Sequence, residues 1–290
     1  MSLIEVKELT KKFGDQTVLN KLSVKIEAGN IYTLIGKNGA GKTTFIKSLL
    51  GMYKNTSGKI LTNLDTKRDL GVMLQENIFP TNIKVGELIK LHLSFYKKKA
   101  DVTALLEKVQ LQNQKNKLVD DLSGGQKRRL SFLLAVAHDP KFIILDEPTT
   151  GMDFDSVRNF IINIKALKAN GKTILMITHD FFQIEEFSDH LLILNAGEIE
   201  ENILMNEMKN KKVLEVSLSK KVNQYEMQNI LYQLDDHIVI VTDINEEKFR
   251  ERNSSYEPMN IKVRNLEVSD IFKKLIYIGG NSDVYNHSAD

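Results

Sequence analysis

The sequence predicts an α/β protein whose core is a parallel sheet. Three short, mostly apolar runs, at residues 31–35, 142–145 and 174–177, support this prediction. A strand that helices cover on both faces has a nearly continuous run of apolar residues, and such burial is typical of parallel sheets. A fourth run, at 70–74, ends like the others at a polar residue or glycine. We therefore expect several strands to present their carboxyl ends at one edge of the sheet.

A glycine-rich segment at residues 36–44, Gly-Lys-Asn-Gly-Ala-Gly-Lys-Thr-Thr, follows the first apolar run. It fits the phosphate-loop pattern G-x-x-x-x-G-K-[ST], and apolar residues at helical spacing come after it. The glycines let backbone N–H groups approach a polyphosphate, and the positive end of the new helix faces the same anion. Lys42 would reach the β- and γ-phosphates, and the Thr43 hydroxyl would complete the shell of a Mg²⁺ ion. The alternative is a plain strand-to-helix turn, but the full pattern in this context predicts a P-loop NTPase.

Composition narrows the class of protein. The chain has 290 residues, of which 42% are hydrophobic and 27% charged, as in an ordinary globular protein. A net charge of +2 gives no reason to expect a nucleic acid partner, and the absence of cysteine excludes disulfides and thiolate metal sites. We see no signal peptide, and no apolar run approaches the roughly 18 residues that cross a bilayer. If the protein works at a membrane, we expect another chain to carry the spans.

The residues around the phosphate loop are predicted to form an antiparallel β subdomain. Apolar residues suggest strands at 3–9 and 22–26, and the β pattern continues at 58–61. Phe13 lies beside a turn between the first two, and its spacing alone favours a core or hairpin residue. From about residue 85 the period becomes helical, so we expect a helical subdomain at about 76–140.

The segment Leu122-Ser-Gly-Gly-Gln-Lys-Arg-Arg-Leu130 begins a predicted helix. Ser123 can cap this helix, whose apolar residues continue to about 137. The simplest interpretation is a plain capped helix. Gly124 and Gly125, however, cost helix stability, which indicates that another group approaches the backbone closely there.

Polar residues end three of the apolar runs. Asp146 and Glu147 follow the run at 142–145, and Gln75 and His179 follow two others. Asp146 could hold Mg²⁺, directly or through water, and Glu147 could polarise a water for attack on phosphorus. A strand-end glutamine or a lone histidine is more often structural, and an acidic pair can be a solvated turn. Here we expect Gly36, Gln75, Asp146 and His179 to meet at one sheet edge, where open α/β sheets bind their ligands.

These motifs, in this order, resemble the nucleotide-binding subunit of ABC transporters over roughly residues 3 to 200. The Leu122–Gln126 segment shortly before the Asp146-Glu147 strand is the discriminating feature, because many NTPases share the phosphate loop. The resemblance implies an ABC-type P-loop NTPase fold. It also implies ATP and Mg²⁺ as cofactors.

The resemblance implies a role for each matching residue. Glu147 would be the general base, His179 would contact the γ-phosphate, and Gln75 would be a hinge that senses Mg²⁺, the attacking water and the membrane partner. Mg²⁺ would be held by Thr43, Gln75 and Asp146. Ser123 and Gly125 would close over ATP bound to the other protomer of a head-to-tail dimer, Asp153 would couple the two sites, and Phe13 would stack on the adenine. The implied nucleotide-binding residues are Phe13, Gly36, Asn38, Gly39, Ala40, Gly41, Lys42, Thr43, Thr44, Ser123, Gly125 and Asp153.

The C-terminal part is predicted to be a separate module. We expect an ATP-binding domain at 1–205, a polar linker at 206–212 and a small α+β extension at 213–290. In the extension, strands are expected at 213–218, 238–241 and 259–263, with helices at about 225–234 and 268–276. In carrying a C-terminal extension of this kind, the chain resembles the exporter ATPases of the bacitracin-resistance and drug- or peptide-export group. Its simplest role is to stabilise a dimer or to regulate, without chemistry of its own.

The resemblance implies an ATPase that powers export through a separate transmembrane permease subunit, at the cytoplasmic face of the cell membrane. It would work as a homodimer, or as a heterodimer with a related ATPase. The Lys-, Asn- and Ile-rich composition further suggests similarity to exporters of small amphipathic peptides such as the phenol-soluble modulins. Two alternatives remain at this point: an importer ATPase, and an ABC-type protein that acts on ribosomes or DNA. One cassette, no heptad insert and a near-neutral charge disfavour the last.

Overall fold

The computed structural model describes residues 2–76, 78–218, 230–234, 237–241 and 258–278. The chain divides into two compact units, Met1–Asn202 and Ile203–Asp290. The first contains the predicted phosphate loop and the strands around it. The second contains the predicted C-terminal extension.

The first unit is organised around a six-stranded sheet of order β5-β6-β7-β3-β8-β9. Its neighbouring strands from β5 to β8 are parallel, so the carboxyl ends of β5, β6, β7 and β3 lie at one edge. This confirms the predicted parallel core sheet. The strands are β5 (Leu70–Met73), β6 (Phe142–Asp146), β7 (Thr173–Ile177), β3 (Ile31–Ile35), β8 (His190–Asn195) and β9 (Glu198–Leu204).

The central strands are buried on both faces, which explains their unbroken apolar runs. In β6, Phe142 and Ile144 belong to a hydrophobic cluster with β1, β2 and α1, whereas Ile143 and Leu145 belong to a second cluster with helices α2 to α5. Successive side chains of a strand point to opposite faces, so one run of residues serves both clusters. The helices are α1 (Lys42–Leu49), α2 (Val85–Phe95), α3 (Val102–Lys108), α4 (Gly124–Val136) and α5 (Phe154–Ala169).

A second, antiparallel sheet of order β2-β1-β4 confirms the predicted β subdomain. It consists of β1 (Ser2–Phe13), β2 (Gln16–Glu27) and β4 (Ser57–Thr62), so the strands are longer than their alternating apolar residues indicate. Phe13 is the last residue of β1 and pairs with Gln16 across the hairpin.

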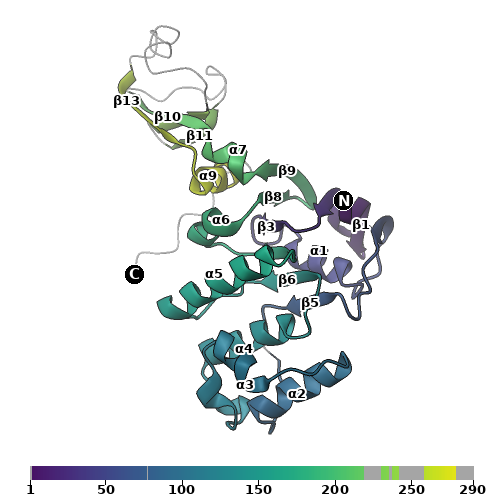
Figure 1. The fold of residues 1–290 in the computed structure, drawn as a ribbon. Coiled ribbons are helices and arrows are strands. Elements are labelled where there is room, and N and C mark those ends of the chain that lie inside the picture. The colour runs from purple at the N-terminus through teal and green to yellow at the C-terminus, as the bar shows by residue number, and fades with distance from the viewer. Residues whose placement is uncertain (1, 77, 219–229, 235–236, 242–257, 279–290) are drawn as a thin grey trace, which may run out of the picture. The chain divides into compact units, whose positions relative to one another are not determined.

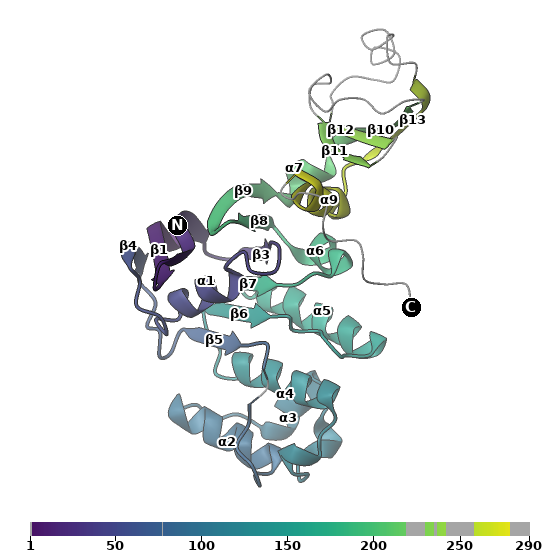
Figure 2. The same ribbon diagram turned by 180° about the vertical axis from the view of Figure 1, so that it is seen from behind.

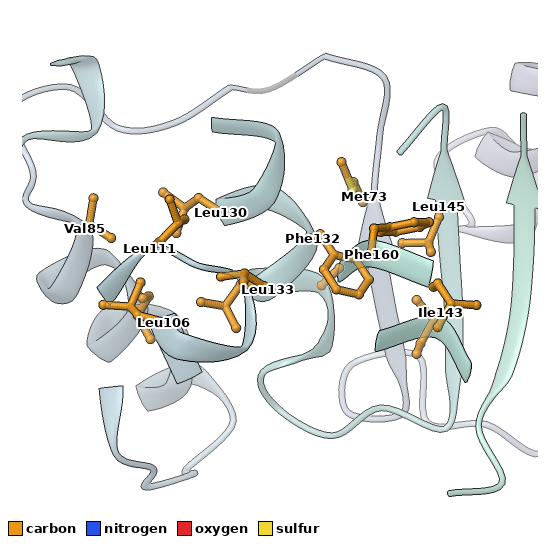
Figure 3. Packing of buried hydrophobic residues seen from close by; sticks show 14 of the residues in the cluster. Met73, Val85, Leu106, Leu111, Leu130, Phe132, Leu133, Ile143, Leu145 and Phe160 are labelled. Atoms are coloured by element: carbon orange, nitrogen blue, oxygen red, sulfur yellow. The ribbon is translucent and has the colours of Figure 1, made fainter. Parts of the chain in front are cut away.

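Helices α2, α3 and α4 gather beyond the β5 edge of the parallel sheet and form the predicted helical subdomain (Figures 1 and 2). Their apolar side chains make one continuous core with the sheet (Figure 3). At the contact with α5, the ring centroids of Phe132 and Phe160 lie 5.1 Å apart in an edge-to-face arrangement. Short 3₁₀ turns at Gln112–Gln114 and Val119–Asp121 lead into α4, and α6 (Phe181–Phe187) follows β7.

The second unit contains a four-stranded antiparallel sheet of order β11-β12-β10-β13. Its buried Asp270 accepts hydrogen bonds from Arg264 and from the Tyr232 hydroxyl. Its elements are α7 (Met205–Lys209), β10 (Lys212–Leu218), β11 (Ile230–Leu234), β12 (His237–Val241), β13 (Pro258–Asn265) and α9 (Val268–Ile278). The structure therefore has the predicted α+β extension.

One expectation for this unit is wrong. The helix expected at about 225–234 is, in its described part, strand β11, and residues 225–229 lie outside the described residues. A segment of ten residues is too short for its apolar spacing to distinguish a helix from a strand, and pairing with β12 decides the outcome. Helix α7 overlaps the segment expected to be a linker at residues 206–209, and its Met205 and Met208 are both buried. Within the described residues of both units, no helix combines the length and apolar character that crossing a bilayer requires.

Candidate functional site

A pocket of about 310 Å³ lies where the phosphate loop meets the carboxyl ends of β5, β6 and β7. Most of the residues expected at the sheet edge therefore line one cavity, as the parallel order of the strands requires. Its lining residues are Val18, Asn38, Gly39, Gly41, Lys42, Thr43, Thr44, Gln75, Asp146, Glu147, Ile177 and His179.

The phosphate loop wraps around the Lys42 side chain. The Lys42 ammonium donates hydrogen bonds to the carbonyl oxygens of Gly36 (2.6 Å) and Lys37 (3.0 Å). Burial lowers the pKa of Lys42, while the charges of Glu147 and Asp146 oppose that shift. Lys42 is also the first residue of α1, which has no side-chain cap at Gly41. The loop thus presents an ammonium and the uncapped amide end of a helix, which together suit a polyphosphate.

Two glycines of the loop are required by the close approach of other segments. A Cβ at Gly36 would lie 2.3 Å from the carbonyl oxygen of Leu194. Gly41 has φ +107°, and a Cβ there would lie 2.9 Å from the Leu19 side chain. Only glycine adopts this backbone without strain. The loop is therefore fixed against β8 and β2 as well as shaped for an anion.

Two carboxylates occupy the end of β6. Asp146 is buried, and Glu147 follows it with φ 49°, a left-handed conformation that is uncommon outside glycine. Burial raises the pKa of Glu147, and the neighbouring Asp146 raises it further, against the opposing charges of Lys42 and Arg128. Burial also raises the pKa of Asp146. A carboxylate with a raised pKa in a pocket is suited to accept a proton from water.

His179 faces Glu147 across the pocket. Its Nε2 lies 3.5 Å from Oε1 of Glu147. Burial, together with the charge of Lys42, lowers the pKa of His179 below its ordinary value of 6.5. The imidazole is therefore neutral at neutral pH, and its contact with Glu147 is not an ion pair. A neutral imidazole can donate one hydrogen bond to a phosphate oxygen or a water.

The donor set fits Mg²⁺ only in the company of a phosphate ligand. Asp146, Thr43 and Gln75 offer oxygen atoms to the same pocket, and hard cations prefer such ligands. Among the described residues, no cluster of three or more histidine or acidic side chains could hold an ion by itself. Mg²⁺ is commonly bound through one or two carboxylates plus substrate phosphates, so this pocket fits a Mg²⁺–nucleotide rather than a resident metal.

Several predicted site residues lie outside the pocket lining. Gly36 and Ala40 shape the loop through their backbones, since Gly36 accepts from Lys42 and the carbonyl of Ala40 accepts from the Gly197 amide at 3.2 Å. Phe13 is 43% exposed, and the Lys11 ammonium lies 4.6 Å from its ring centroid.

The remaining predicted residues cap helices. Ser123 forms a capping box with Gln126 at the start of α4, and Asp153 caps α5 by accepting from the Ser156 amide at 2.8 Å. A Cβ at Gly125 would lie 3.1 Å from the carbonyl oxygen of Gly151. The close approach that the Gly-Gly pair indicated thus includes a segment of the same chain.

Three residues of the site were not predicted from the sequence. Val18 and Ile177 line the pocket, and Arg128 hydrogen-bonds to the backbone of Gln75 and Glu147. Val18 lies on β2, far from the loop in sequence, so nothing local reveals it. The burial of Arg128 could have been predicted from the sequence, because it precedes the apolar Phe132 by about one helical turn and so lies on the buried face of α4.

Comparison with known sequences identifies the family. The family model described as "ABC transporter" matches residues 19–150. The bacitracin transport ATP-binding protein BcrA of Enterococcus faecalis is 31% identical, over 96% of this chain and 97% of that protein. BcrA of Bacillus licheniformis is 35% identical over 75% of this chain and 76% of that protein. The Nod factor export ATP-binding protein I of Rhizobium meliloti is 36% identical over 67% of this chain and 62% of that protein.

Solved structures agree on the fold. The ATP-binding subunit of an ABC transporter superposes with a TM-score of 0.67 at 24% identity, covering 72% of this chain and 92% of that one. A dimeric ATP-binding cassette bound to ADP and Pi superposes with a TM-score of 0.63 at 24% identity, covering 70% of this chain and 98% of that one. The likeness to BcrA of Enterococcus faecalis, at 31% identity over 96% of this chain, shows that the chain belongs to the ATP-binding subunits of ABC transporters, which are ATPases coupled to transport.

Proposed function

We propose that this chain binds and hydrolyses ATP to energise the export of an amphipathic compound or peptide through a separate transmembrane permease. The observation that carries the proposal is the position of Glu147, which shares one pocket with Lys42, Thr43 and His179. The likeness to bacitracin transport and Nod factor export proteins, one of them over 96% of this chain, supports export as the direction.

In the proposed mechanism, the phosphate loop and the ammonium of Lys42 bind the polyphosphate at the start of α1. A Mg²⁺ ion bound with the nucleotide would neutralise charge on the phosphates, with Thr43 and Asp146 as its protein ligands and Gln75 beside them. Glu147 accepts a proton from the water that attacks the γ-phosphate, while the neutral His179 holds a γ-phosphate oxygen by a hydrogen bond. The raised pKa of Glu147 makes it a stronger base than an exposed glutamate.

We propose that a second protomer completes the pocket. Ser123 and Gly125 lie outside this pocket, at the start of α4, where a helix N-terminus can donate to an anion. A head-to-tail dimer would bring them to the partner's ATP, and the dimeric form of a similar cassette bound to ADP and Pi supports this arrangement. The permease would hold the dimer at the cytoplasmic face of the membrane.

The experiment is the Glu147→Gln substitution. We expect ATP hydrolysis to fall by roughly 10²-fold or more, because a positioned base is lost, with ATP binding retained. The variant should then accumulate as an ATP-dependent dimer, measured by size exclusion with light scattering, and this trapped form is the bait for isolating the permease from membranes. Glu107→Gln, an exposed glutamate on α3, is the matched control and should hydrolyse ATP normally. Near-normal turnover by Glu147→Gln would exclude Glu147 as the base.

A further inference from the structure

Arg128 is a buried cation whose hydrogen bonds converge on the two strand ends of the pocket. It lies on α4 and is only 3% exposed. Its guanidinium donates to the carbonyl oxygens of Leu74 (3.1 Å) and Gln75 (2.7 Å) after β5. It also donates to the carbonyl oxygens of Asp146 and Glu147 after β6, the latter at 3.1 Å from Nε.

These bonds hold a strained backbone in place. Glu147 has φ 49°, and its amide donates to the carbonyl of Ile177 at 2.9 Å, while its carbonyl faces Arg128. A non-glycine residue keeps such a conformation only where its surroundings impose it. Arg128 supplies this constraint from one side, and β7 supplies it from the other.

The same guanidinium links two parts of the first unit. Helix α4 begins with the capping box of Ser123 and packs in the helical subdomain, whereas Gln75 and Glu147 follow strands of the parallel sheet. A planar guanidinium with five donors can serve several carbonyl oxygens at once, which an ammonium cannot do in fixed geometry. A displacement of α4 therefore acts on the backbone of both pocket residues together.

We propose that Arg128 is a positioning residue for ATP hydrolysis, which makes the placement of Gln75 and Glu147 depend on the position of helix α4. The inference rests on the proposed function, in which Glu147 is the base and the start of α4 meets the partner's nucleotide. Closure of the dimer on Ser123 would then position Glu147 of the same protomer through the first turn and a half, roughly, of helix α4. Arg128 does not line the pocket, so it would act through the backbone of Gln75 and Glu147.

The first test separates positioning from binding. We expect Arg128→Gln to lower the kcat for ATP roughly 10- to 100-fold, the scale of a misplaced catalytic group, while KM stays within about 2-fold. Lys127→Gln is the matched control, because it removes a cation from the same helix. The Lys127 ammonium donates to the carbonyl oxygen of Asp120 at 3.1 Å, and we expect its loss to leave kcat unchanged. Equal loss in both variants, or an unchanged kcat in Arg128→Gln, would overturn the proposal.

A double-mutant cycle tests whether Arg128 acts through Glu147. If it does, Arg128→Gln adds no further loss of hydrolysis in a Glu147→Gln background, whereas independent effects would multiply. Addition of methylguanidinium at millimolar concentration to Arg128→Ala should recover part of the lost kcat. A general loss of folding would instead lower ATP binding and the melting temperature, would not respond to methylguanidinium, and would refute positioning.

The two proposals fail in different ways. Normal turnover by Glu147→Gln contradicts the proposed function, whatever Arg128 does. Loss of turnover by Glu147→Gln with normal turnover by Arg128→Gln contradicts only the inference about Arg128.

Discussion

Glu147 combines three features that each cost stability. It is largely buried beside another carboxylate, its backbone is left-handed, and its pKa is raised by burial and by Asp146. Residues of this kind gather at functional sites, because selection for activity tolerates local strain and desolvation. The same physical features that suit Glu147 to accept a proton should therefore destabilise the protein in the absence of nucleotide.

We accordingly expect Glu147→Gln to raise the melting temperature of the nucleotide-free protein at pH 7.5. A carboxyl whose pKa is raised on folding favours the folded state when it is protonated, so its contribution is present at low pH and is lost as the pH rises through the folded pKa. Glutamine is neutral at every pH and avoids this loss. Thermal unfolding at pH 7.5 and pH 5 measures the effect, and the gain should shrink at the lower pH. A variant that melts below the wild type at pH 7.5 would contradict it.

Helix α2 is attached to the sheet by a small group of aromatic and imidazole rings. The Tyr96 ring stacks on His138, with ring centroids 3.7 Å apart, and His138 lies after α4. Nε2 of His138 is 3.1 Å from the carbonyl oxygen of Leu70, so it donates there and leaves Nδ1 to accept from Nε2 of His92 at 3.4 Å. Burial, followed by the charge of His138, lowers the pKa of His92 to about 4. The docking of α2 thus depends on neutral histidines.

From this arrangement we expect acid to weaken the protein through His92. A histidine whose pKa is depressed on folding contributes stability above its unfolded pKa of about 6.5, and that contribution is lost as the pH falls toward the folded pKa of about 4. Solvent screening of this half-buried ring keeps the loss well below the roughly 3 kcal/mol that lowering the pKa from 6.5 to about 4 would otherwise cost. Denaturant unfolding of His92→Asn should show a shallower loss than the wild type between pH 7.5 and pH 5. Parallel curves would contradict the role of His92.

The elements also show what could be read from the sequence. The strand runs ending at Gln75, Asp146 and His179 reveal the sheet edge, because burial on both faces leaves an apolar pattern and parallel strands share one edge. The error at β11 and the omission of Val18 have a common cause. Both depend on pairing between distant segments, β11 with β12 and β2 with the phosphate loop, and no local pattern records such partners. The role of Phe13 stays a prediction, since its exposed ring lies outside the pocket lining.

At the scale of the whole molecule, the candidate ATP pocket and the C-terminal extension belong to different units of the chain. Every described residue that lines the pocket belongs to the unit Met1–Asn202. The described part of the second unit has its own sheet and its own buried polar group, in which Asp270 is fully buried and lies 2.6 Å from Arg264. Each unit therefore has the internal contacts that a separately stabilised module needs. Loss of structure in the second unit should leave the ATP pocket intact.

The substitution Asp270→Ala tests this separation in the full-length chain. It leaves the Arg264 charge without its buried partner and deprives the Tyr232 hydroxyl of its acceptor, so we expect a loss of about 3–5 kcal/mol from the second unit. Calorimetry should show one transition shifted down and the other unchanged, with ATP hydrolysis within about 2-fold of the wild type. Glu215→Gln, which removes the more exposed partner of Arg264, should cost no more than about 1 kcal/mol. A parallel fall in both transitions and in hydrolysis would show that the two units are energetically one.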